Sequence, residues 1–184
     1  NEYTLGISLS GTPNGSETLT VNPVSSSIYD AAGNEASTSQ SNNTISLNDQ
    51  LAPTITGVVL ASNNATIAVT FSEAVYNTNS GSGSLEVGDF EFSLDGLNAT
   101  LSSTTPSSID IVGNVYTLGI SLSGTPDGSE TLTVNPVSSS IYDAAGNVAS
   151  TSQSNNTHSL NDQLSPTMTI SAKDSSDQDL NTGL

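Results

Sequence analysis

The sequence has no cysteine, no tryptophan and no arginine, and it has one lysine and one histidine in 184 residues. Without cysteine the chain can form neither a disulfide nor a zinc–thiolate site, and it has no cysteine nucleophile. Because basic residues are missing, the 18 acidic residues give a formal net charge of −17. Nucleic acid is excluded as a partner, since phosphate contacts need lysine and arginine. Attraction to anionic lipid is excluded for the same reason.

The sequence also lacks a long apolar segment and a helical pattern. Its longest apolar run, residues 55–61, is interrupted by Thr56 and Gly57 and is far too short to cross a bilayer. Serine, threonine and asparagine are abundant; they are poor in helix interiors and common in strands and turns. We therefore expect an all-β protein that does not insert into a membrane.

An internal repeat dominates the sequence. Residues 1–56 recur as residues 114–169, with 50 of 56 positions identical. Pro53 and Pro166 each follow a polar stretch and open a new apolar run, so we interpret both stretches as linkers. This phase predicts residues 1–52 as the C-terminal part of one repeat, residues 53–165 as a complete repeat and residues 166–184 as the start of a third.

Two consequences follow from this division. Half a repeat cannot bury its own apolar face, so residues 1–52 should need further chain or a neighbouring molecule to complete them. The sequence starts without methionine and without a signal peptide, so we expect it to be a piece of a longer chain.

Within the complete repeat the hydrophobic period is two. Apolar residues alternate with threonine, serine or glycine in residues 66–71, 109–123 and 129–135. Turn signals separate these segments, among them Asn63-Asn64, Asp95-Gly96 and Asp127-Gly128. Short, regularly spaced strands of this kind are typical of a β-sandwich of about seven strands.

Several strings in the chain resemble bacterial Ig-like or cadherin-like repeats. They are FSEAVY (71–76), GDFEFSL (88–94), IYDAAGN (28–34 and 141–147) and LNDQLAP (47–53). The linker also resembles the cadherin pattern D-x-N-D-N-x-P. Such repeats stand in tandem in large surface proteins and adhesins, so the resemblance implies tandem Ig-like sandwiches that are extracellular, on a bacterial cell surface or secreted.

Calcium is the cofactor that this chemistry favours. Ca²⁺ takes six to eight oxygen ligands from carboxylates, amide side chains and backbone carbonyls, and the base-poor chain leaves its carboxylates available. Loops and linkers of tandem sandwiches converge at the junctions between them. We predict metal ligands Asp30, Asn34, Asn48, Asp49 and Glu73 at the first junction and Asp143, Asn147, Asn161 and Asp162 at the second, with Asp174, Asp177 or Asp179 as further candidates there.

The DAAGN strings have a second interpretation that is compatible with the first. They are typical of tight turns in which Gly33 or Gly146 adopts a positive φ and the Asp and Asn side chains bond to local backbone. Similarly, Asp49 and Asp162 are either metal ligands or solvated linker residues.

Three classes of function compete. The first is a structural or adhesive stalk, or fibre, whose partners are neighbouring repeats and other copies of the chain. The second is a calcium-dependent glycan-binding module, and the third is a filament subunit assembled by strand complementation. We expect no enzyme, because nucleophilic catalysis needs a base beside the nucleophile and His158 is the sole conventional candidate. Near-identical duplication favours the stalk, because it extends length and adds little to an active site.

Overall fold

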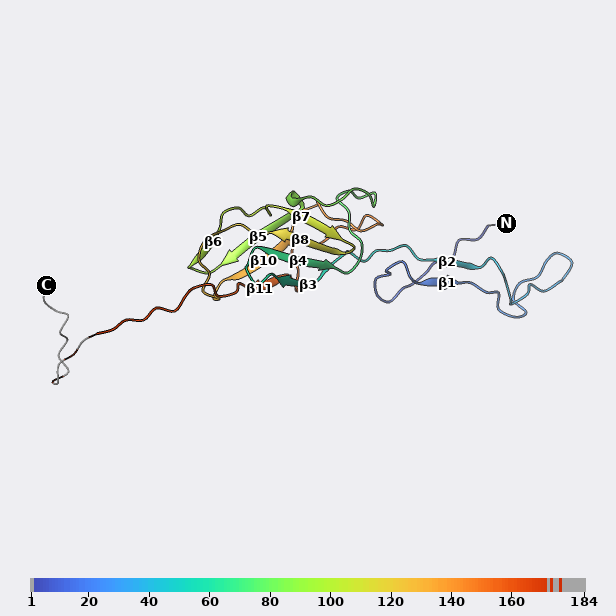
Figure 1. Ribbon diagram of the computed structural model, residues 1–184. Coiled ribbons are helices and arrows are strands. Elements are labelled where there is room, and N and C mark those ends of the chain that lie inside the picture. Colours follow the sequence, from blue (N-terminus) through green and yellow to red (C-terminus); the bar gives the residue numbers. More distant parts are fainter. Residues whose placement is uncertain (1, 172, 174–175, 177–184) are drawn as a thin grey trace.

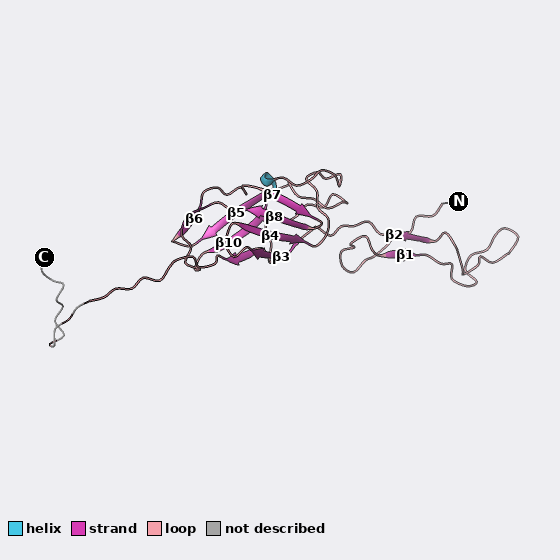
Figure 2. Cartoon of the chain, in the orientation of Figure 1, coloured by secondary structure: helices cyan, strands magenta, loops and turns pink. Residues whose placement is uncertain are grey.

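The computed structural model describes residues 2–171, 173 and 176, and it is all-β (Figures 1 and 2). No α-helix occurs in this part of the chain; a single 3₁₀ turn, η1, spans Val87–Asp89. No helix there is long and apolar enough to cross a membrane. The strands are β1 Thr18–Thr20, β2 Thr44–Ser46, β3 Ile55–Leu60, β4 Thr66–Phe71, β5 Phe90–Asp95, β6 Ala99–Leu101, β7 Ile109–Val112, β8 Val115–Gly119, β9 Leu122–Gly124, β10 Thr131–Pro136 and β11 Thr157–Ser159.

Two antiparallel sheets form the body of the fold. One has the order β3-β4-β8-β7 and the other the order β11-β10-β5. The alternating sequence explains which side chains are buried, because successive side chains of a strand point to opposite faces of the sheet. In β4, Ile67, Val69 and Phe71 are buried while the intervening residues are half-exposed, and β10 buries Leu132 and Val134 in the same way.

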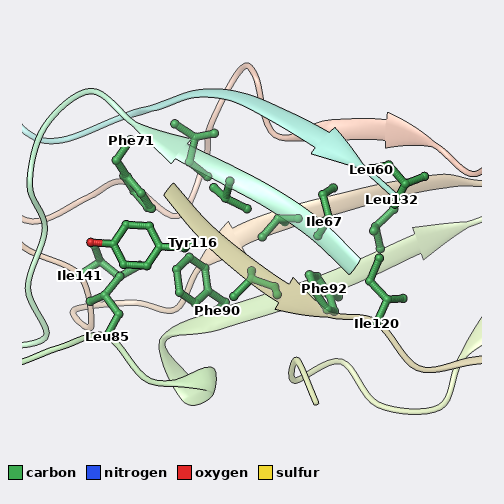
Figure 3. Packing of buried hydrophobic residues seen from close by; sticks show 14 of the residues in the cluster. Leu60, Ile67, Phe71, Leu85, Phe90, Phe92, Tyr116, Ile120, Leu132 and Ile141 are labelled. Atoms are coloured by element: carbon green, nitrogen blue, oxygen red, sulfur yellow. The ribbon is translucent and has the colours of Figure 1, made fainter. Parts of the chain in front are cut away.

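The two sheets face each other across one apolar core. Its members from β4 and β8 pack with members from β5 and β10, and every buried residue of the cluster lies between Ile55 and Leu160. At one end of the core, Phe71, Phe90 and Tyr116 form three ring contacts with centroids 5.6 to 6.3 Å apart (Figure 3). The Tyr116 hydroxyl donates a long hydrogen bond of 3.4 Å to the Val75 carbonyl. The arrangement is a β-sandwich whose core is filled by residues of both sheets.

A buried glutamate holds the small β6–β9 sheet against the rest of the sandwich. Glu130 is fully buried, and its two carboxylate oxygens accept hydrogen bonds from the backbone N–H groups of Ala99 and Asp127 at 3.0 and 3.1 Å. Gly96 lies directly against it, since a Cβ at this position would approach the Glu130 Cγ to 2.4 Å. These contacts satisfy a carboxylate that would otherwise be costly to bury.

Residues 2–52 form a much smaller structure. β1 and β2 pair with the register Thr18↔Ser46, which is the register of Thr131↔Ser159 in the repeated sequence. No core residue comes from this segment in the described part of the chain. The β1–β2 pair therefore forms within this segment, although no sandwich core forms around it in the described residues.

Leu132 and Leu19 occupy matching positions of the repeat and give a controlled test of the core. Leu132 is fully buried and pairs with Leu94 and His158 on either side. Leu132→Ala should lower the free energy of unfolding by about 2–5 kcal/mol, the usual cost of this truncation in a core. Leu19→Ala should change it by less than about 0.5 kcal/mol. Denaturant unfolding followed by circular dichroism measures both, and equal losses would contradict the assignment of the core.

Candidate metal centre

Three carboxylates from distant parts of the sequence meet at one end of the sandwich. Asp49 lies in the segment before Pro53, Glu73 follows β4, and Asp143 lies in the turn after residues 137–142. One carboxylate oxygen from each lies within 4.8 Å of the other two. Asp143 is fully buried, and the other two are half-buried. Like charges held this close repel each other, so the cluster favours either a proton or a cation.

The turn that contains Asp143 explains how this carboxylate is held. Its Oδ1 accepts hydrogen bonds from the backbone N–H groups of Ala145 (2.9 Å) and Asn147 (2.8 Å), and its Oδ2 accepts one from Asn147 Nδ2 at 2.7 Å. Gly146 has a φ of +90°, a conformation that favours glycine. The tight turn expected from the DAAGN string is therefore confirmed. Oδ1 accepts two of these hydrogen bonds and Oδ2 accepts one, so Oδ2 keeps acceptor capacity for a further partner.

Asp49 is positioned by its own turn and by the following unit. Its Oδ1 accepts a hydrogen bond from the Leu51 N–H at 2.9 Å. Its backbone carbonyl accepts one from Asn147 Nδ2 at 3.3 Å, so the same amide contacts both Asp49 and Asp143. The linker is thus joined to the sandwich at the point where the carboxylates meet.

The pKa of Glu73 reflects both its burial and the charges of the cluster. Burial raises the pKa of the Glu73 carboxyl above its ordinary value, and the negative charges of Asp143 and Asp49 raise this pKa further. No basic residue contributes to the shift. The arrangement is one in which a bound cation would relieve repulsion that the protein itself does not neutralise.

The structure groups the candidate ligands differently from the sequence-based expectation. Asp30 and Asn34, expected beside Asp49, form their own DAAGN turn, with Asn34 Nδ2 donating to Asp30 Oδ2 at 2.8 Å. That hydrogen bond lowers the pKa of Asp30. A backbone hydrogen bond from Val21 to Asn43 closes one end of the β1–β2 pair, and the Asp30 turn lies in the loop beyond that end. The linker leaves the pair at its other end, beside Thr18 and Ser46. The structure therefore does not bring Asp30 and Asn34 together with Asp49, and their role as metal ligands stays a prediction.

The same geometry separates the candidates of the second junction. Asn161 bonds to the β3–β4 turn: its Nδ2 donates to the Ala61 carbonyl and to Asn64 Oδ1, both at 3.0 Å. That turn precedes β4, and Glu73 follows β4, so Asn161 and the Asp143 turn lie about 20 Å apart, the length of a six-residue strand. Asn161 therefore fixes the opposite end of the sandwich.

The remaining candidates lie in the linkers. Asn48 is exposed beside Asp49. Asp162 is also exposed, and its Oδ1 accepts a hydrogen bond from the Leu164 N–H at 2.8 Å, as Asp49 does from Leu51. Asp162 is thus the counterpart of Asp49 at the other end of the complete repeat. Positions 174, 177 and 179 lie outside the described residues.

The raised pKa of Glu73 predicts a pH-dependent gain of stability when its charge is removed. A group with a raised folded-state pKa binds its proton more tightly in the folded protein, so its ionisation opposes folding as the pH rises past the ordinary value of 4.5. In calcium-free buffer at about pH 7.5, Glu73→Gln should therefore raise the free energy of unfolding by less than about 1 kcal/mol, the range of solvent-screened charges.

The gain should disappear near about pH 4, where the unchanged protein is protonated at this position. Glu91→Gln, at an exposed glutamate of β5, serves as the control and should show no pH-dependent gain in stability. Thermal unfolding at several pH values measures the stability of the parent protein and of both variants. A Glu73→Gln variant that is less stable than the parent at neutral pH without calcium would contradict the repulsion described above.

Comparison with known proteins gives little that bears on this site. No protein-family model matches the chain, and no curated protein matches it. Among solved structures, the fold is similar to the N-terminal part of the bacterial S-layer protein SbsC, with a TM-score of 0.42 and 20% sequence identity. The match covers 72% of this chain and 33% of that chain. A likeness at this level assigns neither a family nor a function to the chain.

Proposed function

We propose that the chain is a structural repeat segment of a large bacterial surface protein or extracellular fibre, of the Ig-like or cadherin-like kind. In this proposal calcium binds at the cluster of Asp49, Glu73 and Asp143 and stiffens the junction before Pro53. The single observation that carries the proposal is the meeting of a linker carboxylate with two carboxylates of the following unit, all within 4.8 Å.

The donor set selects the class of metal. Calcium and magnesium prefer oxygen ligands, whereas zinc is bound mainly by cysteine and histidine. The chain has no cysteine, and His158, its single histidine, is exposed on β11. Calcium fits better than magnesium, because it accepts irregular geometry and bidentate carboxylates. Asp49, Glu73 and Asp143 would supply carboxylate oxygens, and Asn147 would hold two of these three residues in place.

The position of the cluster supports a mechanical role. Asp49 belongs to the linker, and it also contacts the first segment, since a Cβ on Gly15 would lie 3.3 Å from the Asp49 Cβ. Glu73 and Asp143 belong to the sandwich that follows Pro53. A cation shared by these residues would restrain the linker relative to the sandwich. A row of repeats joined in this way would resist bending.

A glycan-binding role receives less support from the side chains. Sugar sites use exposed aromatic faces, and the three phenylalanines, Phe71, Phe90 and Phe92, are all buried in the core. The exposed aromatic pair beside a pocket, Tyr3 and Tyr29, lies in the first segment. The matching tyrosines of the complete repeat are buried or half-buried. An open pocket beside β5 and β6 is lined by Phe92, Leu94, Leu101 and polar residues of these strands. Of these, Phe92 is the single aromatic residue, and its ring belongs to the core.

Calcium should raise the melting temperature of the protein in a way that depends on Asp49. An ion that binds only the folded state at about a hundred times its Kd stabilises that state by about 2.7 kcal/mol, which corresponds to a rise of several degrees. Asp49→Asn should abolish most of this rise. Asp162→Asn, at the matching linker position, should retain it, because no comparable cluster surrounds Asp162 among the described residues.

Both substitutions keep an oxygen for the local turn, so the two variants are closely matched controls. Melting curves in excess calcium and in EDTA measure the effect, and calorimetric titration counts the ions bound. Identical melting curves with calcium and with EDTA would remove the metal from the proposal.

A further inference from the structure

The chain contains one sequence in two environments. The segment 2–52 and its counterpart 115–165 differ at few positions, yet their apolar side chains are buried in one and exposed in the other. Leu118 is 0% exposed and its counterpart Leu5 is 63% exposed. Ile141 is 0% exposed, whereas Ile28 is 53% exposed. The difference in exposure therefore does not come from the sequence of the two copies. It comes from the chain that covers the second copy and does not cover the first.

Residues 53–113 are what covers the second copy. β8 pairs with β4 on one side and β7 on the other, and β10 pairs with β5. In the first copy, the counterpart of β8, residues 2–6, pairs with no strand in the described part of the chain. Tyr3, Leu5, Ile28 and Tyr29 instead line an open pocket. Their counterparts in the second copy pack into or beside the core.

The first copy has kept every residue that this packing needs. The core positions that the second copy contributes from β8, β10 and the following turns are identical in the first copy. The substitutions fall elsewhere, for example Glu2 for Val115 and Ile45 for His158. His158 is exposed on β11, so Ile45 does not alter the core face. Residues 2–52 thus keep the apolar residues of this face, and no strand of the described part of the chain packs against it.

We propose that the apolar face of residues 2–52 is a docking surface for a polypeptide segment with the pattern of residues 53–113. The register follows from the second copy. A strand like β4 would pair with residues 2–6, placing the counterpart of Ile67 opposite Leu5, as Ile67 lies opposite Leu118. A strand like β5 would place the counterpart of Phe92 opposite Val21, as Phe92 lies opposite Val134.

A second copy of this chain is not the partner. Its own residues 53–113 are covered by residues 114–160 of the same chain, and the short connection between these halves gives the intramolecular pairing a high effective concentration. The partner is therefore a segment of this pattern that has no C-terminal half of its own. Such a segment supplies paired strands and inward apolar side chains, the requirements for completing a sheet.

The test adds that segment to the intact chain. A second copy of residues 53–113 is placed directly before Asn1, the counterpart of Asn114, so that the repeat continues without a break. Hydrogen-exchange mass spectrometry should then show the amides of residues 2–9 exchanging at least about a hundred-fold more slowly than in the unextended chain. Calorimetry should show a second cooperative unfolding transition.

The matched control carries Ile67→Asp and Val69→Asp in the added segment only, because both side chains are fully buried in the sandwich. This extension should leave residues 2–9 exchanging as in the unextended chain. Equal exchange with both extensions would overturn the proposal. So would an unextended chain that sediments as a dimer with residues 2–9 already protected, since a second copy would then occupy the face. Neither result depends on calcium, so the metal proposal is tested separately.

Discussion

The contact between residues 53–113 and residues 114–160 is the interaction on which the rest of the structure depends. Each half supplies strands to both sheets, so neither sheet closes without the other half. The buried side chains of β4 and β8 then face those of β5 and β10, and apolar burial stabilises the pairing. Backbone hydrogen bonds give the register, but the apolar core makes the assembly cooperative.

The repeated sequence shows how much this contact contributes. The β1–β2 pair and the DAAGN turn at Asp30 form without it, with the same register and the same side-chain hydrogen bonds as their counterparts. These features are made by residues close in sequence or by one short ladder. The strand at residues 2–6 does not form without its neighbours, because an isolated strand has no partner for its backbone groups.

The acidic cluster is a product of the same contact. Glu73 lies in the first half of the sandwich and Asp143 in the second, so the two carboxylates approach each other only because the halves pack. Burial of the carboxyl raises the pKa of Glu73, and the negative charges of Asp143 and Asp49 raise it further. The chain has one lysine and no arginine, so in the proposed function a bound cation, rather than a basic side chain, would offset this repulsion.

The amino-acid sequence by itself determined the all-β class, the strands at residues 66–71 and 129–135, and the tight turns. Each of these depends on a period of two or on a few neighbouring residues. The sequence-based expectation also grouped Asp49 with Glu73 at one junction; in the structure they meet because one precedes β3 and the other follows the antiparallel strand β4. Only the tertiary structure decided that Asp143 joins them and that Asp30 does not. Which of the two turns joins Asp49 and Glu73 depends on the end of the sandwich that the turn reaches. That position follows from the strand order, and strand order is set by the packing of segments that are distant in the sequence, whereas periodicity is local.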